Sequence, residues 1–134
     1  MAQTASLIVE RESSLEAYFA HRVRSALGGI VIKMVPLVRG TPDRLVMLPG
    51  GQLHLVELKT ETGNLSPAQM VWHDRARQLG ATVYTLRGRP EIVTWLRARA
   101  REIDGTAARA ASLRRRAPVR SQVVSCSCEH ICGA

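Results

Sequence analysis

The chain has 134 residues, of which 46% are hydrophobic, and its formal net charge is +8. This length favours one domain with a core of its own, and no apolar run approaches the roughly 20 residues of a membrane-spanning helix. No basic region followed by an apolar stretch opens the chain, so we expect a cytoplasmic protein with no membrane partner.

Most of the positive charge lies in the C-terminal third. Residues 87–120 contain ten arginines and three acids, whereas residues 1–86 contain nine basic and seven acidic residues. This distribution indicates a polyanionic partner, most simply nucleic acid, and a solvated tail without a partner is the alternative. Only Lys33 and Lys59 are lysines, so Lys59 is expected to be needed as a compact point charge.

A helix is predicted from about Ile8 to Leu27, because large apolar residues recur there every fourth position, at Leu15, Phe19, Val23 and Leu27. Glu12 and Glu16 lie one turn apart on a neighbouring face, where like charges repel mildly. A nearby cation would relieve that repulsion, although an ordinary solvated acidic face is equally compatible with the pattern.

A strand (30–35) and a loop (36–42) precede a β-hairpin, whose strands 44–48 and 52–59 are joined by a Pro-Gly-Gly turn. Both faces of the second strand are mostly apolar, which predicts cover on both sides. Asp43 opens the first strand, while Glu57 and Lys59 share one face of the second. Such charges must pair or hold an ion, so the hairpin predicts a two-carboxylate cation site or a buried ion pair.

The second half of the chain begins a helix at Ser66-Pro67-Ala68-Gln69, which has the features of a capping box. That helix is expected to end near Leu79, and a strand (81–86) and a helix from Pro90 to about Ile103 follow. Residues 107–117 could extend as a loose helix, but Pro118 and the polar tail favour little fixed structure.

The predicted order is therefore α-β-β-β-α-β-α, an α/β or α+β fold with a mixed four-stranded sheet flanked by helices. We expect a domain over residues 8–104 and a flexible, Arg-rich, Cys-containing tail over residues 105–134.

These elements together resemble a stand-alone VRR-NUC domain of the phage and prophage type, within the PD-(D/E)xK, restriction-endonuclease-like superfamily. The resemblance covers about residues 8–97. It is carried by the helix with Glu12 and Glu16, by Gly40-Thr41-Pro42-Asp43, by the Gly-Gly turn, by Val56-Glu57-Leu58-Lys59, and by Leu65-Ser66-Pro67-Ala68-Gln69 with Trp72.

The resemblance implies a restriction-endonuclease-like core and a Mg²⁺- or Mn²⁺-dependent DNA endonuclease. Asp43 and Glu57 would be metal ligands, Lys59 the catalytic lysine and Gln69 the downstream active-site glutamine. Glu16 would be the helix glutamate at the metal, with Glu12 as second choice. The family also implies a homodimer that cuts four-way (Holliday) junctions, flaps or forks during replication, repair or recombination, in a bacterial or phage-infected host cell.

The chemistry of phosphodiester hydrolysis agrees with this assignment. Mg²⁺ takes few carboxylates and keeps waters and phosphate oxygens, so Asp43, Glu57 and the backbone carbonyl of Leu58 would suffice for one or two ions. Nucleic-acid contacts are predicted for six basic residues, Lys33, Arg39, Arg44, Arg114, Arg115 and Arg116. The alternative function is a non-catalytic nucleic-acid-binding module that uses the basic tail.

Two weaker patterns concern histidine and cysteine. Cys126, Cys128, His130 and Cys132 lie closer together than the ligands of ordinary structural zinc sites, so zinc binding by the tail is not expected. His54 and His73 are expected to be packing or surface residues.

Overall fold

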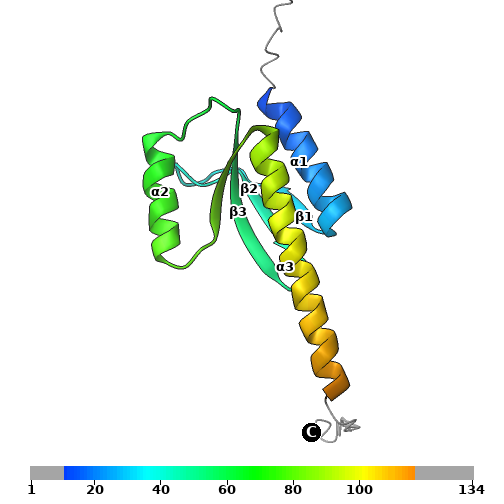
Figure 1. Cartoon of the computed structure of the whole chain (residues 1–134). Helices are drawn as coiled ribbons and strands as arrows, with labels where there is room; N and C mark the ends of the chain where they lie inside the picture. Colours follow the sequence, from blue (N-terminus) through cyan, green and yellow to red (C-terminus); the bar gives the residue numbers. More distant parts are fainter. Residues whose placement is uncertain (1–10, 117–134) are drawn as a thin grey trace, which may run out of the picture.

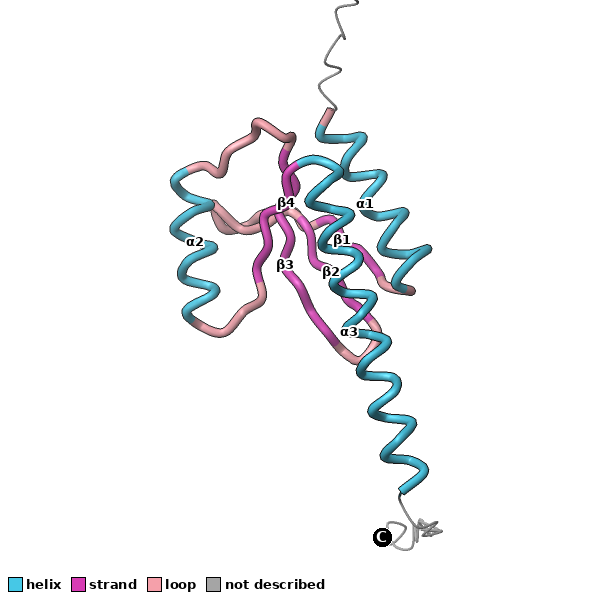
Figure 2. The backbone as a smooth tube through the Cα atoms, in the orientation of Figure 1, coloured by secondary structure: helices cyan, strands magenta, loops and turns pink. Residues whose placement is uncertain are grey.

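The computed structural model describes residues 11–116 and contains three helices and four strands in this range (Figures 1 and 2). In chain order these are α1 (Glu12–Leu27), β1 (Ile30–Lys33), β2 (Arg44–Leu48), β3 (Gln52–Lys59), α2 (Pro67–Gln78), β4 (Val83–Arg87) and α3 (Gly88–Arg116). The predicted α+β class and element order are confirmed. The expected start of the first helix, near Ile8, lies outside the described residues.

The four strands form one mixed sheet in the order β1-β2-β3-β4. The first three strands pair antiparallel, and β4 runs parallel to β3 after the crossover through α2. Gly50 and Gly51 have φ angles of 83° and 76°, which is why the hairpin turn between β2 and β3 requires two glycines.

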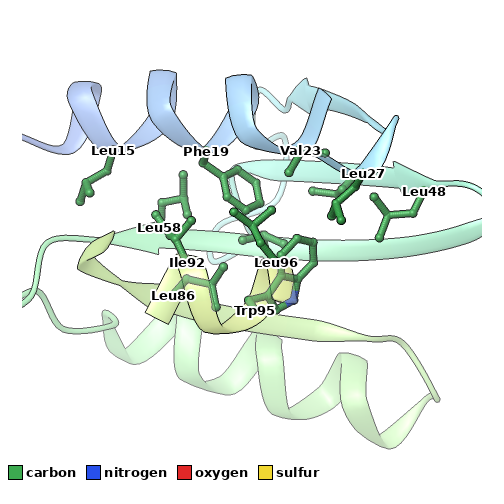
Figure 3. Close-up of a cluster of buried hydrophobic side chains, with 12 residues drawn as sticks. Leu15, Phe19, Val23, Leu27, Leu48, Leu58, Leu86, Ile92, Trp95 and Leu96 are labelled. Atoms are coloured by element: carbon green, nitrogen blue, oxygen red, sulfur yellow. The ribbon is translucent and has the colours of Figure 1, made fainter. Parts of the chain in front are cut away.

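The main core lies between the sheet and the pair α1 and α3, which cover one face together. The four apolar residues of α1 point at side chains from β3 and α3, among them Leu58, Ile92 and Leu96 (Figure 3). Phe19 meets Trp95 at a ring-centroid distance of 5.5 Å. This tight packing fixes α1, and with it Glu16, against the sheet.

The opposite face of the sheet is only partly covered, because α2 packs beside β4 and contacts the Glu57 end of β3 but leaves β1 and the start of β3 exposed (Figure 1). Ile30, Ile32 and Leu53 are 58%, 41% and 57% exposed on that face. The prediction that the second hairpin strand is covered on both sides is therefore wrong at Leu53. Period-2 alternation identifies apolar faces, but it does not say how far a helix extends across them.

Helix α3 is longer than the sequence indicates, and the expected end near Ile103 is wrong. The helix continues through Gly105 to Arg116, and Ile103 is partly buried against the core. Beyond it the residues up to Arg115 are exposed. Alanine, arginine and leucine have high helix propensity, which offsets the roughly 1 kcal/mol cost of one glycine. The division into a domain and a flexible tail at residue 104 stays a prediction.

Among the helices of residues 11–116, none is long and apolar enough to cross a membrane.

Candidate active site

Three of the predicted site residues meet where β2 begins and β3 ends. Arg44 pairs with Val56 in the sheet register, so the preceding residue, Asp43, lies opposite Glu57. The backbone N–H of Asp43 donates to Glu57 Oε2 at 3.2 Å, and Lys59 Nζ lies 2.9 Å from Glu57 Oε1. The Glu57 side chain is 5% exposed. Leu58 lies between Glu57 and Lys59 on β3, and its side chain points into the core (Figure 3).

Gln69 joins this cluster from the first turn of α2. Its side-chain amide completes the capping box, because Oε1 accepts a hydrogen bond from the Ser66 N–H at 2.8 Å. The other end of the same amide, Nε2, donates to Glu57 Oε1 at 2.6 Å. The helix cap and the carboxylate contact are thus made by one side chain.

Of the two helix glutamates, Glu16 is the one near the cluster. Its carboxylate contacts Arg44 Nη2 at 2.6 Å and Lys33 Nζ at 3.3 Å, whereas Glu12 is exposed at the start of α1. Arg44 also contacts Asp43 Oδ2 at 3.2 Å and its own side chain is only 4% exposed. Arg44 therefore links Glu16 to Asp43 from beneath the site, in a position with little access for a DNA phosphate.

The surroundings of Asp43 are suited to a cation. Burial is the main reason why the pKa of Asp43 lies above its ordinary value of 3.8, and the nearby Glu57 and Glu16 add to it, while Arg44 opposes them. Oδ1 of Asp43 is buried and has no hydrogen-bond partner in the described part of the chain. A divalent cation would offset the clustered negative charge, and Oδ1 could serve as one of its ligands.

The cluster nevertheless contains only two adjacent carboxylates, Asp43 and Glu57, and the third, Glu16, lies farther away. Among residues 11–116, no group of three or more histidine, cysteine, aspartate or glutamate side chains is close enough to hold an ion. The residues that fit a cation are Asp43 and Glu57, with Glu16 held one step away by Arg44. The cysteine tail and its possible zinc ligands lie outside the described residues.

His73 lies in the region of the site as well, which the sequence reading did not anticipate. It occupies α2 one turn after Gln69, is fully buried, and neither ring nitrogen has a partner among the described residues. Burial lowers its pKa, opposed by the nearby charge of Glu57. Of the two predicted alternatives, packing or surface, its full burial excludes the surface, and the i+4 spacing from Gln69 is the sequence signal that places it in this region.

The predicted nucleic-acid contacts separate into two regions. Lys33 and Arg39 are exposed near the Asp43 end of the sheet. The end of α3, with Arg114 and Arg115, projects beyond the hairpin turn, at the opposite end of the molecule (Figure 1). Arg116 ends the helix, and its side chain is outside the described part. The C-terminal arginines are therefore not part of the cluster around Glu57.

Comparisons with known proteins agree with this arrangement. No family model matches the chain. It is 43% identical over 77 residues to "Putative nuclease p44" of Acyrthosiphon pisum secondary endosymbiont phage 1. The matched segment covers 57% of this chain and 82% of that relative. A solved structure described as a VRR_NUC domain superposes with a TM-score of 0.60 at 33% identity, covering 64% of this chain and 94% of that one. The chain therefore belongs to the VRR-NUC family of phage-type nucleases, with its restriction-endonuclease-like fold.

Proposed function

We propose that this nuclease is a Mg²⁺- or Mn²⁺-dependent endonuclease that hydrolyses phosphodiester bonds in branched DNA. The observation that carries the proposal is the contact set around one buried carboxylate. Glu57 is approached by Lys59 at 2.9 Å, by Gln69 at 2.6 Å and by the Asp43 N–H at 3.2 Å. A bound divalent cation would supply a polarised phosphate oxygen and a more acidic water.

The chain's own residues have separate roles in this proposal. Asp43 and Glu57 bind the cation, with the Leu58 carbonyl available beside them. Gln69 holds the Glu57 carboxylate in a fixed orientation, as the outer-shell partners of metal ligands commonly do. Lys59, whose side chain is 18% exposed, is placed to orient the attacking water or to stabilise negative charge on the phosphate.

The rival function is nucleic-acid binding without cleavage, through the basic end of α3. Lys59 and Gln69 offset the cost of burying the Glu57 carboxylate, but a pure binding module has no need for this cluster in the first place. The position of the α3 arginines far from this cluster is compatible with both functions, so the two functions are distinguished by whether the protein cleaves DNA.

The deciding experiment compares Glu57→Gln and Lys59→Ala with the unchanged protein on duplex, flap, fork and four-way-junction DNA. We expect both variants to fold and bind DNA but to cleave about 10²–10³-fold more slowly, because each loses a group that acts on the transition state. Asp74→Asn is the matched control, since Asp74 is an exposed acid of α2 whose contact is with Gln78. Near-normal turnover of either site variant would overturn the assignment.

We further propose that the protein acts as a twofold symmetric homodimer. Two cuts are needed to resolve a four-way junction, and closed twofold dimers are the commonest assembly. The open apolar face of the sheet, with Ile30, Ile32 and Leu53, supports this proposal as the contact surface. A location in the cytoplasm of a bacterial or phage-infected cell accords with a DNA substrate.

A further inference from the structure

A groove outside the Glu57 cluster runs between α2 and the loop that joins β1 to β2. It has a volume of about 490 Å³ and is lined by Arg39, Pro67, Ala68, Val71, Trp72 and Arg75. The loop reaches across to α2, away from the rest of the sheet (Figure 2). One side of the groove is thus a loop residue, Arg39, and the other is a flank of α2.

The groove is built by a close contact between the loop and the helix. Gly40 has a φ angle of 93°, and a Cβ at this position would clash with the carbonyl oxygen of Ala68. On α2, residues 68, 72 and 75 follow one flank, and Gln69 and His73 follow the adjacent flank that faces the sheet. The groove therefore lies one helix flank away from the proposed catalytic cluster.

The chemistry of the groove combines a flat apolar surface with positive charge. Trp72 is partly exposed, Val71 is 72% exposed, and both Arg39 and Arg75 are exposed at the rim. No acidic residue lines the groove. Within the described residues, the structure gives the side chains of Arg39 and Arg75 no ion pair, so both guanidinium groups are available to an anion.

The indole of Trp72 is supported from the sheet side. The buried His73 ring meets it edge-on, with centroids 6.1 Å apart and planes at 78°. A partly exposed, supported aromatic ring between two arginines is the arrangement that single-stranded nucleic acids use, with bases on the ring and phosphates on the cations.

We propose that this groove binds an unpaired nucleotide of the DNA substrate, with its base stacked on Trp72 and its phosphates between Arg39 and Arg75. The inference rests on the proposed DNA-cleaving function and specifies its substrate class. In continuous duplex both faces of each base are covered by neighbouring pairs, whereas the single-stranded arm of a flap or a fork offers a free base. The groove thereby gives a physical reason for cleavage of those branched DNAs that carry a single-stranded arm.

A second copy of the chain is a poorer occupant of the same groove. A twofold contact brings each surface against itself, so Arg39 and Arg75 would face the same residues of the partner without an acid in the groove to compensate. Like charges placed across an interface oppose association.

The test uses the full chain with Ca²⁺ in place of Mg²⁺ to suppress cutting. Each flap DNA carries either a normal base or an abasic site at one of the unpaired nucleotides near the branch, and the position is varied from one DNA to the next. We expect the unchanged protein to bind the normal base about 5- to 150-fold more tightly at one position, the range that base–aromatic stacking provides. Trp72→Leu should remove this preference, and Trp72→Phe should retain it. Arg75→Gln should weaken both DNAs equally, whereas Arg24→Gln, an exposed arginine of α1, should change neither.

A second measurement needs no variant, and so does not depend on folding of Trp72→Leu. Substitution of 2-aminopurine at the same nucleotide should give fluorescence quenched on binding, because the base stacks on the indole. Equal affinity for base and abasic DNA, or no quenching at any position, would overturn the proposal. So would a Trp72→Leu variant that changes the oligomeric state and leaves the base preference intact.

The groove and the nuclease proposals can fail separately in this design. A base preference in Ca²⁺ without cleavage in Mg²⁺ would remove the endonuclease proposal and leave the groove. Cleavage that depends on Glu57, with no base preference, would remove the groove and leave the endonuclease.

Discussion

Arg44 holds the carboxylates near the site in place by contacts from a single buried guanidinium. It contacts Glu16 at 2.6 Å and Asp43 at 3.2 Å, and its side chain is 4% exposed. The side chains of Glu16 and Asp43 are 25% and 27% exposed, so water screens part of the charge of each carboxylate. Arg44 is a positioning residue in this view, and the planar guanidinium suits a role in which two acids must be contacted at once.

Substitution of Arg44→Leu should lower the free energy of unfolding by about 2–3 kcal/mol. Removal of one partner from a fully buried pair costs about 3–5 kcal/mol, and the partial exposure of Glu16 and Asp43 reduces that figure. Urea denaturation at neutral pH measures the change. Lys33→Leu is the matched control, because Lys33 contacts the same Glu16 but is 70% exposed, so its loss should cost under about 1 kcal/mol. Equal costs for the two variants would contradict the role of Arg44.

Helix α2 connects local helix chemistry to the catalytic cluster at the element scale. Its N-terminus is closed by Ser66 and Gln69, whose hydrogen bonds are 3.2 and 2.8 Å long. The same Gln69 amide orients Glu57 of the neighbouring sheet. The start of the helix is therefore tied to β3, and displacement of α2 would disturb the site as well as the groove on its outer flank.

A pair of substitutions separates the cap from the site. Ser66→Ala and Gln69→Ala should each lower stability by about 0.5–2 kcal/mol, because each removes part of the capping box. Only Gln69→Ala should also slow cleavage, by about 10- to 100-fold, since it removes an outer-shell partner of Glu57. Thermal unfolding and Mg²⁺-dependent cleavage, measured well below the midpoint, give the two quantities. Parallel losses of cleavage in both variants would show that Gln69 acts through the cap alone.

At the scale of the whole molecule, the arginines of the α3 extension and the catalytic cluster occupy opposite ends (Figure 1). The α3 extension carries Arg109, Arg114 and Arg115, exposed beyond the packed part of the helix. Because residues 105–116 are helical, they present these charges along one axis. DNA that contacts both regions would have to pass along the length of the domain.

Truncation after Asp104 should reduce DNA affinity at moderate salt. It should also flatten the slope of log affinity against log salt by roughly two to five units, because each phosphate neutralised on duplex DNA contributes about 0.9 to that slope. The fold should persist, since Ile103 is the last residue of α3 that packs against the core. Truncation after Arg116 is the control, which keeps four of the five arginines between residues 105 and 120 and should change the slope by about one unit or less. Identical slopes for all three chains would leave the extension without a role in binding.

The assembly prediction also belongs to the whole molecule. The full chain should be a dimer by light scattering at micromolar concentration, and Leu53→Glu should make it a monomer by charging the open sheet face. Leu113→Glu is the matched control, because Leu113 is 69% exposed on the α3 extension and should leave the dimer intact. A monomer of the unchanged protein, with and without DNA, would count against the dimer.

Several features of the site are determined by sequence alone, because they depend on neighbours in the chain. Strand alternation places Glu57 and Lys59 on one face, the Gly-Gly turn sets the register that brings Asp43 opposite Glu57, and the capping-box pattern positions Gln69. Short-range geometry fixes each of these, and the structure shows the resulting contacts around Glu57. Their assignment to catalysis is a proposal that the experiments above test.

Tertiary structure decided what depends on residues far apart in the chain. The closeness of Glu16, rather than Glu12, to the cluster and its ion pair with the buried Arg44 both follow from how α1 packs against α3, β1 and β3, which no local pattern specifies. The open sheet face and the groove beside Trp72 exist because α2 covers only one edge of the sheet and meets the loop at Gly40. Periodicity tells which side of an element is apolar, whereas the partner that covers it is chosen by the packing of the whole chain.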